Sequence, residues 1–285
     1  MLWGSAFPAI RAGYSELGIN SGDTFSIILF AGIRFFGAGV LTLLIFSLLQ
    51  KKTLMFKKTD APKITVLSVF QTVLQYLFFY LGLAFTTGSR ASVVNATSVF
   101  FAILISALLF KFEKLTAAKI VGSLLGFAGV ILVSLDAFTS GGKPIGEGFI
   151  ILSSLSYAFS SVFMKRYSKD SDPAMLSGWQ FVLGGAVMIC VGLIFGGRLS
   201  TVNAAGVLIT VYLMLVSALA YSMWSILIKY NSVSKVTVCG FLTPIFGFVL
   251  SLMFDSSSSS SSLALALPAL VLAVAGIITV NKSQN

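Results

Sequence analysis

Ten mostly apolar stretches, separated by short charged or turn-forming segments, make up nearly all of this chain. Since a helix needs about 20 apolar residues to cross a bilayer, each stretch except the shorter first one is long enough to cross it once. The stretches cover residues 1–14, 24–49, 64–86, 90–110, 116–137, 147–165, 174–196, 204–228, 236–254 and 263–281. The sequence therefore predicts an all-α membrane protein with ten transmembrane helices.

Composition excludes a soluble protein. Charged residues are 10% of the chain and hydrophobic residues are 57%, whereas a soluble domain has about 25% charged residues. Ten crossings would use roughly 200–230 residues, which leaves no room for a separate soluble domain.

The basic residues predict orientation rather than a nucleic-acid partner. The net charge is +10, but the cations lie in short loops between apolar stretches and not along one solvated face. Of the 19 Lys and Arg residues, 14 fall on one side of the ten-helix arrangement, four fall on the other, and Arg34 lies within a span. The positive-inside rule then places both termini in the cytoplasm of a multi-pass plasma (inner) membrane protein.

The composition gives little indication of a catalytic site or a metal site. The chain has no histidine, which excludes histidine metal sites and histidine-dependent nucleophiles. All nine acidic residues map to loops or to the ends of spans, so paired carboxylates are not expected inside the membrane. Cys190 and Cys239 lie in apolar stretches and are interpreted as small hydrophobic residues. We expect neither an enzyme nor a metal or cofactor site.

The two halves of the chain repeat each other. Arg34-Phe35 is matched by Gln180-Phe181 at an offset of 146 residues, and Tyr76 is matched by Tyr221 at an offset of 145. A repeat of five helices is odd in number, so the second copy must cross the membrane upside down. The sequence predicts two inverted five-helix repeats, at residues 1–138 and 146–281, an architecture in which substrate binds near the midplane.

Polar and aromatic residues within the spans are candidates for substrate contact, because buried polar groups are costly in a membrane. The candidates are Trp3, Arg34, Gln75, Tyr76, Tyr80, Asn95, Ser98, Tyr157, Gln180, Tyr221 and Trp224. Arg34 suits a carboxylate or phosphate, although we favour a structural role in which it ties neighbouring helices together. The Tyr and Trp residues have an alternative role as anchors at the membrane surface.

Small residues recur at helical spacing in the fifth and tenth predicted helices. Gly122, Gly126 and Gly129 lie in the fifth, and Ala269 and Ala273 lie in the tenth. Such faces allow close helix packing within one protomer or between two. We therefore expect a monomer or a homodimer through these helices.

Several short segments together resemble a known family. They are Trp3-Gly4-Ser5-Ala6-Phe7, Arg34-Phe35, Gly88-Ser89-Arg90-Ala91-Ser92, Glu113-Lys114-Leu115-Thr116, Gly122 to Gly129 and Thr243-Pro244-Ile245-Phe246. In this combination the chain resembles the EamA branch of the drug/metabolite transporter superfamily. The resemblance implies ten helices, cytoplasmic termini, a central cavity and alternating access. It also implies transport of amino acids, other small metabolites, nucleotide sugars or sugar phosphates, often as export. The run Ser256 to Ser262 departs from the family pattern and is low-complexity.

The scarcity of charge within the spans favours one class of solute. Sugar phosphates and nucleotide sugars would need several membrane-embedded cations to offset their desolvation, and Arg34 is the only one well inside a span. We expect an alternating-access secondary carrier, an exporter or exchanger, for amino acids or related zwitterions. Its partners would be a small-molecule substrate and membrane lipid. The alternatives are an exporter of drugs or toxic compounds and a non-transporting membrane scaffold.

Overall fold

The structure is a computed structural model that describes residues 2–20, 22–83, 85, 91, 94–133, 144–243, 245–246 and 260–282. All regular secondary structure in these residues is helical. Arg90, Pro244 and the serines before Ser260 lie outside the described residues.

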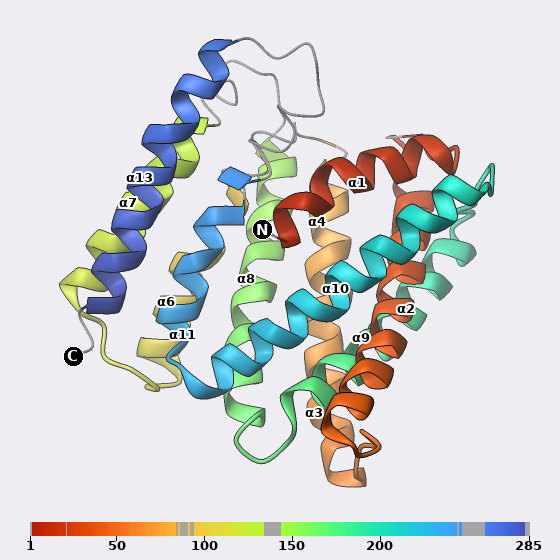
Figure 1. The fold of residues 1–285 in the computed structure, drawn as a ribbon, viewed down its shortest axis with the longest axis horizontal. Coiled ribbons are helices and arrows are strands. Elements are labelled where there is room, and N and C mark those ends of the chain that lie inside the picture. The colour runs from red at the N-terminus through yellow and green to blue at the C-terminus, as the bar shows by residue number, and fades with distance from the viewer. Residues whose placement is uncertain are drawn as a thin grey trace. The chain divides into compact units, whose positions relative to one another are not determined.

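The helices follow the predicted apolar stretches (Figure 1). They are α1 (Leu2–Glu16), α2 (Thr24–Gln50), α3 (Ala61–Leu67), α4 (Gln75–Leu83), α6 (Ser98–Leu104), α7 (Ala117–Val133), α8 (Pro144–Tyr167), α9 (Pro173–Ile194), α10 (Ala204–Tyr230), α11 (Val233–Thr237) and α13 (Ser260–Lys282). Within the described residues, five segments are long and apolar enough to cross a membrane, namely Thr24–Gln50, Lys58–Leu83, Pro144–Tyr167, Pro173–Ile194 and Ala204–Tyr230. Shorter apolar helices are found at Ser98–Leu109, Ala117–Leu132 and Leu267–Lys282. The prediction of an all-helical membrane protein is confirmed, while the number of ten spans and their inverted arrangement stay predictions.

The span predicted at residues 64–86 is not a uniform α-helix. A π-helical turn, Ser68–Leu74, joins α3 to α4. A π turn hydrogen-bonds five residues apart instead of four, so this part of the span departs from the regular α-helix. The turn also explains a glycine in α9, since a Cβ on Gly184 would lie 2.6 Å from the Cβ of Thr72.

The chain folds into two compact units, each built from both halves of the sequence. The first unit contains residues 1–8, 81–162 and 231–285, and the second contains residues 9–80 and 163–230. In the first unit α7 packs along α13, and in the second unit α2 packs along α9 (Figure 1).

Glycines hold both of these helix pairs close together. In the second unit a Cβ on Gly32 would lie 3.0 Å from the carbonyl oxygen of Gly185, and one on Gly39 would lie 2.7 Å from that of Gly178. The backbones of α2 and α9 approach each other closely because these residues have no side chain.

The first unit has the same kind of seam. A Cβ on Gly122 would lie 2.7 Å from the carbonyl oxygen of Gly276, and one on Gly129 would lie 2.7 Å from that of Ala269. Sequence left open whether this small-residue face works within a protomer or in a dimer. The structure uses it within the chain.

The first unit also contains a buried ion pair that sequence analysis did not anticipate. Lys119 Nζ of α7 donates to Glu113 Oε2 at 2.7 Å, and these side chains are 2% and 7% exposed. Glu113 Oε1 accepts from Ser106 Oγ at 2.6 Å and from the backbone N–H of Ser234 in α11 at 3.1 Å. Burial tends to raise the pKa of Glu113, but the hydrogen bonds from Lys119, Ser106 and Ser234 outweigh it and hold that pKa below its usual value.

Candidate functional site

A buried cation lies within the second unit. Arg34 of α2 is 4% exposed, and its Nε and Nη2 both donate to Ser217 Oγ of α10, at 3.1 and 3.0 Å. Its guanidinium carbon lies 4.8 Å from the centre of the Phe35 ring. Among the residues that the structure describes, no carboxylate pairs with Arg34.

Aromatic rings from four helices surround this region. The hydroxyl oxygens of Tyr76 in α4 and Tyr221 in α10 are 2.5 Å apart. The Phe35 ring lies 4.3 Å from that of Tyr76, and the Phe181 ring lies 4.9 Å from that of Tyr221. Phe35 and Phe181 stack on each other at 5.2 Å. The four rings therefore form one continuous aromatic cluster that joins α2, α4, α9 and α10.

Two more tyrosines extend the cluster. Tyr80 lies one turn beyond Tyr76, with ring centres 6.1 Å apart, and its side chain hydrogen-bonds to that of Tyr14 in α1. Arg34 interacts electrostatically with the side chains of Tyr14, Tyr76 and Tyr80. The buried positive charge is thus neighboured by phenol groups, which are polar but uncharged.

Gln180 of α9, which precedes Phe181 in the sequence, is a polar residue that is completely buried. Its Oε1 accepts from Thr72 Oγ1 at 2.7 Å. Its Nε2 has no hydrogen-bond partner within the described part of the chain. A buried unsatisfied donor costs about 1–3 kcal/mol, so its retention calls for an explanation.

The contacts of the cluster are reciprocal between the halves of the chain. At the offsets found in the sequence, Arg34 corresponds to Gln180 and Thr72 corresponds to Ser217. Arg34 bonds to Ser217, and Gln180 bonds to Thr72. Sequence analysis missed Thr72 and Ser217, although the offset of 145 that paired Tyr76 with Tyr221 also pairs these two residues.

The structure divides the predicted site residues between the units. Seven belong to the second unit: Arg34, Gln75, Tyr76, Tyr80, Gln180, Tyr221 and Trp224. Of these, Gln75 is partly buried on α4 and Trp224 is 8% exposed on α10. The contacts described above connect Arg34, Tyr76, Tyr80 and Tyr221 with Phe35 and Phe181, whereas Gln180 is bonded to Thr72.

The other four predicted residues, Trp3, Asn95, Ser98 and Tyr157, belong to the first unit. Asn95 accepts from Ser154 Oγ of α8 at 3.3 Å, one helical turn before Tyr157. Ser98 begins α6 and is 8% exposed. Trp3 lies in the first turn of α1. Their contact with a substrate stays a prediction.

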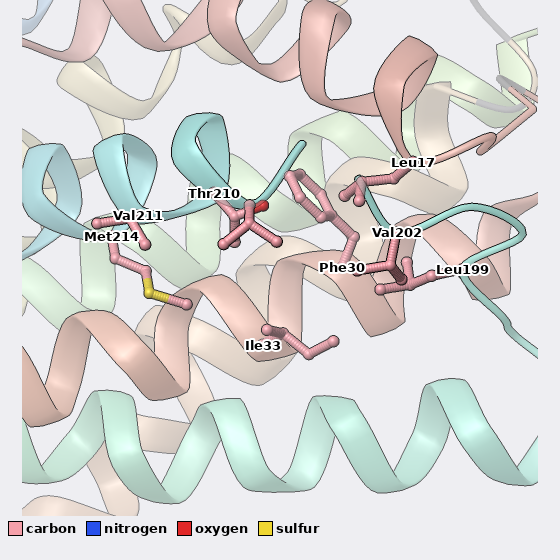
Figure 2. Close-up of a pocket in the computed structure, with 9 residues that line it drawn as sticks. Leu17, Phe30, Ile33, Leu199, Val202, Thr210, Val211 and Met214 are labelled. Atoms are coloured by element: carbon pink, nitrogen blue, oxygen red, sulfur yellow. The ribbon is translucent and has the colours of Figure 1, made fainter. Parts of the chain in front are cut away.

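A small apolar pocket lies within the second unit, and part of its wall comes from α2, which carries Arg34, and from α10, which carries Ser217. Its volume is about 200 Å³. Its walls, shown in Figure 2, are Leu17, Phe30, Ile33, Leu199, Val202, Val207, Thr210, Val211 and Met214. Phe30 precedes Arg34 by one turn of α2, and Met214 precedes Ser217 by about one turn of α10. The Thr210 hydroxyl donates to the Gly206 carbonyl at 2.7 Å, so it is already satisfied and the pocket wall is effectively apolar.

This arrangement combines a cation, aromatic rings and an apolar pocket, which are groups that can bind a solute. The described residues contain no group of three His, Cys, Asp or Glu side chains that would hold a metal. The guanidinium of an arginine is suited to a carboxylate, and the rings and the pocket are suited to apolar groups. Buried polar groups of this kind within a helical membrane protein are typical of a solute pathway.

Comparison with known proteins identifies the family. The model of the EamA-like transporter family matches residues 1–135 and again residues 144–281. The chain belongs to this family and is a multi-pass membrane transporter.

Relatives of known sequence agree with this assignment. The uncharacterized inner membrane transporter YedA of Escherichia coli is 28% identical, over 99% of this chain and 88% of its own length. A chloroplastic WAT1-related protein of Arabidopsis thaliana is also 28% identical, over 62% of this chain, and the match spans only 45% of that protein. A crystal structure of another protein, 18% identical, shares the fold with a TM-score of 0.78 over 98% of this chain and 92% of its own.

Proposed function

We propose that this protein is an alternating-access secondary carrier, an exporter or exchanger, for amino acids or related zwitterions. The observation that carries the proposal is Arg34, a buried cation whose hydrogen bonds go to a neutral serine rather than to a carboxylate. An unpaired charge inside a membrane protein is expensive to maintain and is a functional candidate for that reason.

The surroundings of Arg34 favour a solute with one carboxylate. A single guanidinium can neutralise one carboxylate through two parallel hydrogen bonds, whereas a sugar phosphate would leave further negative charge uncompensated. The rings of Tyr76, Tyr80 and Tyr221 offer apolar surface to the rest of the solute. In the first unit we retain Trp3, Asn95, Ser98 and Tyr157 as proposed contacts.

The reciprocal contacts support ten spans arranged as two inverted repeats. A two-fold relation requires that when residue i contacts residue j, the counterpart of j contacts the counterpart of i. The pairs Arg34–Ser217 and Thr72–Gln180 satisfy this rule, and Tyr76 meets its own counterpart Tyr221. We further propose that both termini are cytoplasmic and that the protein works as a monomer or as a homodimer through α7 and α13.

The apolar pocket supports a second candidate, an exporter of drugs or other toxic apolar compounds. Its wall is apolar, because the Thr210 hydroxyl is already hydrogen-bonded, and such a wall suits a neutral apolar drug better than a zwitterion.

A screen of solutes against the purified protein, followed by flux measurements, tests both candidates. We expect an amino acid to raise the melting temperature, because a ligand that binds only the folded state stabilises it. The same solute should cross proteoliposome membranes in a protein-dependent way. Tyr76→Ala and Trp224→Ala should each weaken that flux, and both variants should stay folded by circular dichroism.

Other outcomes of this experiment would reject the proposal. Stabilisation by a phosphorylated sugar and by no amino acid would exclude a zwitterion carrier. Stabilisation and flux of apolar compounds alone would favour the drug exporter. Undiminished flux in both variants would remove the aromatic cluster from the substrate site.

A further inference from the structure

The segment that follows α2 carries a dense group of lysines at a membrane surface. It joins Thr24–Gln50 to Lys58–Leu83, two segments that are long and apolar enough to cross a bilayer. Lys51, Lys52, Lys57 and Lys58 are all exposed on it. We name residues 51–59 the lysine loop. Because a span ends and another begins here, the lysine loop lies at the depth of the lipid headgroups.

The lysine loop is held in a fixed conformation. Leu54 at its centre is 4% exposed; its N–H donates to Ser47 Oγ at 3.1 Å, and its carbonyl accepts from Trp179 Nε1 at 2.9 Å. The Phe56 ring packs edge-on against Trp179 at 4.8 Å. At the far end, the Lys57 N–H donates to Asp60 Oδ2 at 3.1 Å. The lysines are therefore displayed by an ordered scaffold rather than by a mobile coil.

Three of the lysines have no internal counter-charge. Lys52 pairs with Asp172 at 3.3 Å, and Lys63, just beyond the loop, pairs with Asp60 at 3.3 Å. Lys51, Lys57 and Lys58 pair with no carboxylate among the residues described. Three exposed cations without a carboxylate partner on one short loop form an anion-attracting surface.

Apolar side chains are exposed beside these cations. Leu48 and Leu49 in the last turn of α2 are 78% and 70% exposed, and Met55 in the loop is 65% exposed. A soluble anion would leave these side chains in water. A phospholipid would cover them with its acyl chains while its phosphate meets the lysines.

We propose that the lysine loop is a binding site for an anionic phospholipid, with Lys51, Lys57 and Lys58 contacting the headgroup and Leu48, Leu49 and Met55 contacting the acyl chains. The general preference of lysines for one side of the membrane explains where the residues lie. It does not explain why the loop is rigid or why apolar side chains flank the unpaired charges. The site is independent of the transported solute.

The test compares two triple variants of the purified, full-length protein. The first, Lys51→Gln/Lys57→Gln/Lys58→Gln, removes the unpaired charges of the lysine loop. The matched control, Lys111→Gln/Lys114→Gln/Lys282→Gln, removes three exposed lysines elsewhere. The two triples are comparable because each includes one lysine with a left-handed backbone, Lys51 at φ 51° and Lys111 at φ 52°. Affinity for phosphatidylglycerol is measured in mixed micelles by competition with a nitroxide-labelled lipid, with phosphatidylcholine and inorganic phosphate as comparison probes.

We expect wild type to bind phosphatidylglycerol more tightly than phosphatidylcholine. A lysine near an anionic lipid surface contributes roughly a fivefold gain in affinity, so the loop triple should bind roughly 100-fold more weakly at low salt. This difference should shrink as salt is added. The control triple should bind as wild type does, and all three proteins should melt at similar temperatures.

Three results would overturn the proposal. Equal weakening in both triples would show that net charge, and not the loop, attracts the lipid. Equal affinity for phosphatidylglycerol and phosphatidylcholine in wild type would exclude headgroup recognition. Competition by inorganic phosphate at the same concentration as the lipid would identify a soluble anion as the ligand.

Discussion

Among the residues that the structure describes, each unit buries one cation, and the two cations are compensated in opposite ways. Lys119 in the first unit meets the carboxylate of Glu113 at 2.7 Å, which in turn accepts from Ser106 and from the backbone of α11. Arg34 in the second unit donates to the neutral Ser217 and lies near the ring of Phe35, and it pairs with no carboxylate among the residues described. The units are otherwise alike, since each packs a pair of long helices through glycines.

The difference separates a structural charge from a candidate binding charge. A buried ion pair whose hydrogen-bonding groups are satisfied has a structural role, because removing either partner leaves an uncompensated buried charge. A buried cation without a carboxylate retains the capacity to bind one from a solute. Glu113 therefore should matter for folding, and Arg34 should matter for the solute.

The largest effect is expected from Glu113→Gln in the first unit. The substitution keeps the size of the side chain but leaves Lys119 buried without its counter-charge, which costs about 3–5 kcal/mol. For a protein of this size we expect the melting temperature to fall by roughly 10 °C in thermal unfolding. Lys52→Gln is the control, because its pair with Asp172 is exposed and contributes about 0–1 kcal/mol. If Glu113→Gln and Lys52→Gln had equal melting temperatures, the structural role of the Glu113–Lys119 ion pair would be contradicted.

The stability contributed by the Glu113–Lys119 pair should also depend on pH. Because the pKa of Glu113 is lowered in the folded protein, its stabilising contribution is complete above its unfolded pKa of about 4.3 and is lost as the pH falls through the folded pKa. The difference in stability between wild type and Glu113→Gln should therefore be constant near neutral pH and shrink in acid. A difference that grew on acidification would contradict the direction of the shift.

The next largest effect is expected at Arg34. Arg34→Gln makes this position equal to its counterpart Gln180 and removes the guanidinium, so affinity for a carboxylate solute should fall by roughly 10–100-fold, the range for a charged hydrogen bond. Ser217→Ala is the matched variant, since it breaks the tie between α2 and α10 but keeps the cation. If Arg34 were only such a tie, both substitutions would weaken solute binding equally. We expect Ser217→Ala to retain binding, as measured by the solute-induced rise in melting temperature.

The helical membrane fold and the residue types of the cluster could be predicted from the sequence. The fold follows from the length of the apolar stretches, and the cluster follows from the polar residues within them. Arg34, Tyr76 and Tyr221 were identified since polar groups within apolar stretches are conspicuous. The constant offset between the halves also anticipated which residues correspond.

Contacts between helices far apart in the sequence could not be predicted from the sequence. The repeat predicts that Tyr76 and Tyr221 are equivalent, but only the packing of α4 against α10 shows that their hydroxyls meet. The Glu113–Lys119 pair was overlooked for a similar reason. Glu113 lies outside the predicted spans, so it was placed at a span end, and its burial depends on the approach of α11.

A smaller effect is expected from the glycine seams, which the two units share. Gly39→Ala in the second unit would place a Cβ 2.6 Å from the backbone nitrogen of Val182, and Gly122→Ala in the first would place one 2.7 Å from the carbonyl oxygen of Gly276. Backbone atoms cannot yield as side chains do, so each substitution should cost about 1–3 kcal/mol by thermal unfolding. Gly148→Ala on α8 is the control, because its Cβ would meet nothing within 4 Å and should be neutral or slightly stabilising. If Gly39→Ala and Gly122→Ala were as stable as Gly148→Ala, close backbone packing would not be what holds either helix pair together.

The smallest effect is expected from the hydroxyl pair at the centre of the second unit. Tyr76→Phe and Tyr221→Phe each remove one hydroxyl and leave the stacking with Phe35 and Phe181 in place. Because the two hydroxyls bond to each other, the double variant should cost little more than either single one, with a coupling of about 1 kcal/mol in a double-mutant cycle. The cycle can be run twice, once on unfolding and once on solute binding. Coupling in unfolding alone would make the pair a structural contact like Glu113–Lys119. Coupling in solute binding would show that the hydroxyl pair belongs to the solute site together with Arg34. We expect this outcome because both hydroxyls belong to the cluster that surrounds the unpaired cation.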